Sequence, residues 1–136
     1  MRTSLDQDTI IFKLLNVPAV TSVITGGIYK GRRPAGSELE DIIINSPTTG
    51  DGTRQYGVSN VNIYVPDVKT TIAGKEQFLT NTARLLTLTN LVKPILEETD
   101  GDDYVVWIDS TRVRPEYEIN QHFINIRIEV QMYNHQ

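Results

Sequence analysis

The final third of the chain contains a strict alternation of apolar and polar residues. Across 124–132, every second residue is aliphatic or methionine, and the residues between them are Asn125, Arg127, Glu129 and Gln131. Successive side chains of a strand point to opposite faces of a sheet, so this pattern predicts a long strand with one buried and one hydrated face. Long alternation is typical of antiparallel sheets, and we expect the neighbouring strand to be the apolar segment 104–109.

Three segments upstream also predict strands. Residues 28–30 form a short candidate after a pair of glycines, and the β-branched run at 41–45 predicts a strand buried on both faces. Residues 58–65 alternate again, and Pro66 ends them. The intervening stretch 46–57, SPTTGDGTRQYG, consists of turn-forming residues. It predicts either a loop or the tip of a hairpin.

Two segments predict helices. Ser4 and Gln7 have the spacing of a capping box and precede apolar residues at helical spacing, which predicts a helix over 5–15. Residues 71–98 carry a wide apolar arc, which predicts a longer helix packed on a sheet. Pro94 interrupts this segment, so the helix either kinks there or is followed by a second short helix.

The order of these elements is one helix, three strands, a long helix and two strands. Since helices and strands do not alternate singly, we expect an α+β fold: an antiparallel or mixed sheet with the N-terminal helix and the long helix on one face. The chain of 136 residues shows no repeat or linker, which predicts a single domain over 1–136. We expect neither a signal peptide nor a membrane span, because no apolar run is long enough.

Composition argues against several kinds of site. The net charge of −4 opposes a general role in nucleic-acid binding. The absence of cysteine excludes disulfides, zinc thiolates and cysteine nucleophiles. The acidic residues at 38–41 are expected to be solvated in a turn, and those at 97–103 lack the ligand spacing of an EF-hand. We therefore expect no metal and no cofactor.

The sequence offers no set of residues for catalysis. Its two histidines are His122, at the start of the final strand, and His135, in the tail. Neither lies in a motif that pairs a nucleophile with a base. The segment 31–36, GRRPAG, does not match a phosphate-binding loop and does not lead into a helix. We expect no catalytic residues and predict that the protein is not an enzyme.

Interaction surfaces are the remaining candidates for a functional site. The connections at 31–41 and 46–57 are long for a small domain, and long loops without catalytic residues commonly form interfaces. We predict interface residues there, namely Lys30, Arg32, Arg33, Glu38, Glu40, Arg54 and Tyr56. Two alternatives remain open. One is an adaptor that adds a partner strand to an exposed edge of the strand at 122–133. The other is a nucleic-acid-binding protein that uses these basic residues, with Arg112 and Arg114 as a second group.

The order of short motifs resembles that of a known family. The segments IIFKLLNVPAV, GGIYKGRRP and EDIIINS are similar to the opening of the tail-completion or tail-terminator proteins of tailed bacteriophages. The later segments VNIYVPD, TARLLTLTNLV and INIRIEVQMY fit the same layout. The stretch 46–57 is longer here than is usual in that family.

The resemblance implies a non-enzymatic structural protein that forms a homo-oligomeric ring, commonly a hexamer, at the head-proximal end of a tail. Its implied partners are further copies of itself, the tail tube and the head-connector proteins. DNA would pass through the ring without sequence-specific binding. The implied location is the virion, and the host cytoplasm during assembly. The ring surface is expected to involve the loops at 31–41 and 46–57 and the edge of the strand at 122–133.

Overall fold

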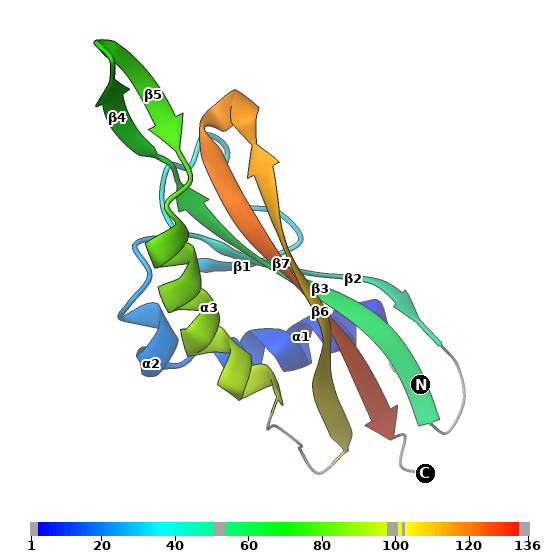
Figure 1. Ribbon diagram of the computed structural model, residues 1–136. Coiled ribbons are helices and arrows are strands. Elements are labelled where there is room, and N and C mark those ends of the chain that lie inside the picture. Colours follow the sequence, from blue (N-terminus) through cyan, green and yellow to red (C-terminus); the bar gives the residue numbers. More distant parts are fainter. Residues whose placement is uncertain (1–2, 51–53, 98–100, 102, 134–136) are drawn as a thin grey trace.

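The computed structural model of the protein describes residues 3–50, 54–97, 101 and 103–133. The elements follow the chain in this order (Figure 1): α1 (Ser4–Leu15), α2 (Pro18–Thr21), β1 (Ile28–Lys30), β2 (Ile42–Thr49), β3 (Arg54–Pro66), β4 (Val68–Ile72), β5 (Lys75–Leu79), α3 (Thr82–Glu97), β6 (Tyr104–Glu116), the 3₁₀ turn η1 (Tyr117–Ile119) and β7 (Gln121–Tyr133). The α+β class is confirmed.

Five strands form a mixed sheet in the order β1-β2-β3-β7-β6. β1 runs parallel to β2, and the other neighbours are antiparallel. The predicted pairing of 104–109 with the final strand is confirmed within the longer β6. The predicted free edge on 122–133 is wrong, because β3 pairs with β7 along its whole length and β6 covers the other side. β6 is instead the long edge strand.

The helices pack on one face of this sheet. The inward residues of β7 are buried as the alternation predicts, and they meet side chains of α1 and α3 in one core. The fully buried members of that core include Ile11, Leu15, Ile42, Ile63, Leu88, Val92, Ile126 and Ile128. The opposite face carries asparagines, and Asn125 donates to Asn60 and Asn62 on the neighbouring strand. The sheet therefore has the one apolar and one hydrated face that the sequence predicts.

The cap of α1 lies one residue earlier than predicted. Thr3 and Asp6 form the capping box: the backbone N–H of Thr3 donates to Asp6 Oδ2 at 2.7 Å, and Asp6 N–H donates to Thr3 Oγ1 at 3.4 Å. Gln7 is fully buried instead and donates to Ser59 Oγ of β3 at 2.7 Å. The long helix, α3, runs through Pro94 to Glu97 as one element, so no further helix begins at the proline.

The helix predicted over 71–98 begins only at Thr82, so its first part, 71–81, is wrong. β4 and β5 form an antiparallel hairpin there, which we call the arm (residues 68–79). Ala73 and Gly74 make its turn with φ of 52° and 78°, the left-handed backbone that tight hairpin turns require. The arm extends away from the helices and the five-stranded sheet (Figure 1).

The stretch 46–57 belongs to a hairpin, one of its two predicted forms. β2 continues to Thr49 and β3 begins at Arg54, so strands occupy most of it. Residues 51–53 lie outside the described residues, as do His135 and positions 98–100 and 102 of the acidic segment.

Candidate interaction surfaces

Arg33 anchors the loop 31–41 to the sheet. Its Nε donates to Asp41 Oδ2 at 3.0 Å, and its Nη1 donates to Gln121 Oε1 of β7 at 2.7 Å. The guanidinium lies 4.2 Å from the ring centroid of Tyr64 on β3, a cation–π contact. These contacts join the loop to β3 and β7, so Arg33 fixes the path of the loop across the end of the sheet.

The acidic residues that end this loop are buried, which corrects the prediction that they are solvated. Asp41 is 1% exposed; besides Arg33, it accepts hydrogen bonds from Ser37 Oγ at 2.5 Å and from the backbone N–H of Gly27 at 3.1 Å. A Cβ at Gly26 would collide with this carboxylate and with the carbonyl oxygen of Glu40. The glycine pair therefore allows β1 and β2 to start side by side around a buried ion pair.

Glu40 forms a second ion pair, which joins the same loop to α3. Both of its carboxylate oxygens accept from Arg84, at 2.5 and 2.8 Å. Glu40 Oε1 also accepts from the N–H of Thr25 at 3.2 Å. The hydrogen bond to Glu40 raises the pKa of Arg84. Two of the predicted interface residues, Arg33 and Glu40, thus have structural roles inside the chain.

Four others lie on the surface. Arg32 and Glu38 are exposed on the rim of an open hollow of about 610 Å³ between residues 32–38 and residues 118–121. Tyr56 is 54% exposed on β3. Lys30 is exposed too, and its Nζ donates to Thr9 Oγ1 of α1 at 3.0 Å. Arg54 begins β3, and its side chain lies outside the described part.

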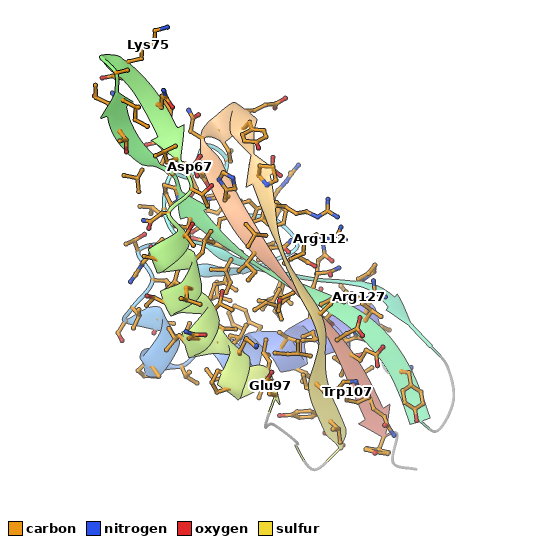
Figure 2. All side chains as sticks on the ribbon, in the orientation of Figure 1. Asp67, Lys75, Glu97, Trp107, Arg112 and Arg127 are labelled. Atoms are coloured by element: carbon orange, nitrogen blue, oxygen red, sulfur yellow. The ribbon has the colours of Figure 1, made fainter. Side chains whose placement is uncertain are left out.

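His122 holds the base of the arm, a role that sequence reasoning missed. Its Nδ1 lies 2.6 Å from Asp67 Oδ1, directly before β4, and its Nε2 lies 3.1 Å from Thr80 Oγ1, directly after β5. Asp67 N–H also donates to the carbonyl oxygen of Asn120 at 2.9 Å. Figure 2 shows Asp67 where the arm leaves the body. One side chain of β7 therefore contacts both ends of the arm.

The hydrated face of the sheet carries a basic group near its β6 edge. Arg112, Arg114 and Arg127 line a hollow of about 320 Å³ together with Asn125. Arg127 Nε lies 3.3 Å from Asp109 Oδ2, and Arg112 pairs with Asn125 across the strands (Figure 2). This arrangement can bind carboxylate or phosphate groups of a partner.

A small buried polar cluster joins α1 to β2 and β3. Ser46 Oγ lies 2.5 Å from Asp8 Oδ1 and 2.6 Å from Ser59 Oγ, which in turn accepts from Gln7. Burial raises the pKa of Asp8, and the hydrogen bond from Ser46 and the charge of Lys30 oppose that rise. The cluster orients α1 on the sheet.

Among the residues that the structure describes, no group of three or more histidines or carboxylates could hold a metal ion. Within the same ranges, no helix is both long enough and apolar enough to cross a membrane.

Comparison with known proteins finds a likeness in structure but none in sequence. No protein-family model matches this chain. No curated protein matches it in sequence. Among solved structures, a chain of the "Virion of native gene transfer agent (GTA) particle" superposes with a TM-score of 0.50. The match covers 96% of this chain and 90% of that one at 12% sequence identity. At this identity, the likeness shows a shared fold over nearly the whole length of both chains.

Proposed function

We propose that this chain is a non-enzymatic structural protein of a phage-like virion. In this proposal it forms a homo-oligomeric ring at the head-proximal end of the tail, as a tail terminator or completion protein that joins tail to head. The observation that carries the proposal is the fold shared with a chain of a gene transfer agent virion over 96% of this protein. The sequence motifs point to the same class through the order of elements, independently of that superposition.

The placement of the polar residues supports a structural role. His122 is engaged at the base of the arm, and the carboxylates of Glu40 and Asp41 pair with arginines. Side chains engaged in this way hold the segments of the chain together. The partners proposed are further copies of the chain, the tail tube and the head connector, with DNA passing through without sequence-specific binding. The place of action is the virion, and the host cytoplasm during assembly.

The proposal is tested with purified protein and isolated tail tubes. We expect native mass spectrometry at high protein concentration to give one discrete oligomer, and negative-stain images to show a ring with a central opening. Added to tail tubes, the protein is expected to cap a single end. Tubes incubated with an unrelated acidic protein of similar size serve as the control. A protein that stays monomeric at every concentration and leaves tube ends uncapped would refute the proposal.

A further inference from the structure

An apolar groove runs beside the N-terminal half of α3. It encloses about 330 Å³, and its walls include Leu85, Leu86 and Thr89 of α3, Val113 of β6 and Ile124 of β7. Leu86 is 59% exposed and Val113 is 51% exposed. We call this surface the α3–β6 groove. Large apolar side chains gathered in one concave surface commonly mark a contact with a partner.

The arm has one aliphatic face. Residues paired across its two strands lie on the same side, so the pairs Val68–Leu79 and Ile72–Lys75 share a face. The apolar members of this face are Val68, Ile72 and Leu79, and each is 43–45% exposed. Thr70, Gln77 and Lys75 lie on the same face. The other face carries Phe78 and the ion pair between Lys69 and Glu76 at 3.3 Å. A two-stranded hairpin is marginally stable alone in water, so an uncovered aliphatic face on it suits a partner.

The arm does not cover the groove of its own chain. Figure 1 shows it leaving the body at the N-terminal end of α3 and pointing away from the helix. His122 contacts both ends of the arm, through Asp67 and Thr80, and so holds its base in this direction. The arm therefore projects beyond the surface that contains the groove.

We propose that the aliphatic face of the arm docks in the α3–β6 groove of a neighbouring copy of this chain. The inference rests on the proposed ring and names the contact that would build it. Arm and groove are different surfaces of one chain, so their contact is head-to-tail, and a head-to-tail contact that closes on itself makes a ring. Thr80 directly follows the arm and lines the groove, so the groove begins where the arm leaves the body.

Charge also favours a second copy as the occupant. The arm contains two lysines and one glutamate, whereas the whole chain has a net charge of −4. The arm therefore has a net charge of +1 and the rest of the chain a net charge of −5. Two copies of net charge −4 repel each other overall, and the arm is the segment whose charge is opposite to that of another copy's body, so a contact through the arm is favoured over a contact between two bodies. Lys93, which lines the groove, is paired with Glu97 at 3.9 Å.

Matched substitutions separate the two faces of the arm. Ile72→Glu and Phe78→Glu each replace an exposed apolar residue that faces a lysine across the hairpin, Lys75 and Lys69 respectively. Each new glutamate lies opposite a lysine, so the two substitutions are expected to affect the stability of the hairpin alike. Only Ile72 lies on the aliphatic face. On the groove, Leu86→Glu is compared with Leu5→Glu on α1, which is also exposed. Each variant is first checked by circular dichroism and thermal unfolding.

We expect Ile72→Glu and Leu86→Glu to weaken self-association at least tenfold, because burial of one such side chain is worth more than a factor of ten in affinity. Phe78→Glu and Leu5→Glu are expected to assemble as the unchanged protein does. An equal mixture of Ile72→Glu and Leu86→Glu still has one intact arm and one intact groove. It is expected to form dimers and nothing larger, whereas neither variant alone forms them.

The outcomes distinguish the docking contact from the proposed function. If the unchanged protein forms rings and both variants still assemble, the docking contact is wrong and the proposed function stands. The contact is also overturned if Ile72→Glu and Phe78→Glu weaken self-association equally. The same holds if the mixture of Ile72→Glu and Leu86→Glu forms no dimers. A protein that never associates overturns both proposals.

A second measurement serves if a glutamate variant fails to fold. The chain has no cysteine, so single cysteines can be introduced without competing thiols. Ile72→Cys mixed with Leu86→Cys and a short bismaleimide is expected to give a covalent dimer at least tenfold faster than Ile72→Cys mixed with Leu5→Cys. Equal yields from the two mixtures would overturn the contact.

Discussion

Two adjacent arginines, alike in the sequence, lie in opposite environments. The side chain of Arg33 is 15% exposed and that of Asp41 is 1% exposed, and their nearest atoms are 2.9 Å apart. Arg32 is exposed at the rim of the hollow beside the loop. Removal of one partner of a buried ion pair leaves an uncompensated charge, which is far more costly than loss of a surface charge.

We expect Arg33→Ala to lower the free energy of unfolding by about 3 kcal/mol, because Asp41 would stay buried without its cation. Arg32→Ala is the matched control and is expected to change it by less than about 0.5 kcal/mol. Urea denaturation of both variants at neutral pH measures the difference. Equal effects would show that Arg33 does not anchor the loop as described.

Asp8 gives stability a dependence on pH. Its pKa in the folded protein is raised, chiefly by burial, above the ordinary value of 3.8. The folded chain therefore binds this proton more tightly than the unfolded chain. The contribution of Asp8 to stability is complete below 3.8, and it is lost as the pH rises through the raised pKa.

Asp8→Asn is expected to remove this part of the pH dependence. The amide oxygen can still accept from Ser46 Oγ, while the buried charge is gone. We expect a higher free energy of unfolding at pH 7. We also expect this free energy to depend less on pH above 3.8, the ordinary pKa of Asp8. Urea denaturation at pH 4 and at pH 7 measures both. An unchanged slope between these two pH values would contradict the assignment.

At the scale of elements, the strands could be predicted where alternation is long, as in β3 and β7. The arm could not, because five residues per strand give too short a pattern against the helical spacing around Leu79. The β-branched residues of β4 and the Ala73-Gly74 pair were the available signal. The cap of α1 was misplaced because Thr3–Asp6 and Ser4–Gln7 both fit a capping box. Only burial of Gln7 against β3 separates the two.

The interaction surfaces were harder to predict because a sequence shows charge without its partner. Arg33 meets Gln121, 88 residues away, and Arg84 meets Glu40, 44 residues away. His122 meets Asp67, 55 residues away. Contacts of this span depend on the sheet order, which no local pattern contains. The loop 31–41 was predicted to form an interface, and three of its charged residues, Arg33, Glu40 and Asp41, serve the fold.

His122 links β7 to the base of the arm, and its removal is expected to loosen the arm selectively. His122→Ala would leave the carboxylate of Asp67, which is 3% exposed, without this partner and would free Thr80. We expect amide hydrogen exchange in residues 68–79 to rise by about tenfold to a hundredfold, with a smaller change in β7. Mass-spectrometric exchange measures both regions. A uniform rise across the sheet would indicate global destabilisation and contradict a specific clamp.

At the scale of the whole molecule, the chain consists of a packed body and a projecting arm. The hydrophobic core contains residues of both long helices and of the five-stranded sheet, and it includes no residue of 68–79. We therefore expect the stability of the body to depend little on the arm. Such a division of roles is expected when one element is kept for contact with another molecule.

Replacement of the arm by a two-residue Asn-Gly turn tests this division. Val68 and Leu79 are paired, so Asp67 and Thr80 lie close enough for a hairpin turn of two residues to join them. We expect one cooperative unfolding transition with a free energy within about 1 kcal/mol of the unchanged protein, because no core contact is lost. Urea denaturation measures this value. A loss of more than about 2 kcal/mol would mean that the arm stabilises the body, and self-association by the shortened chain would mean that assembly uses another surface.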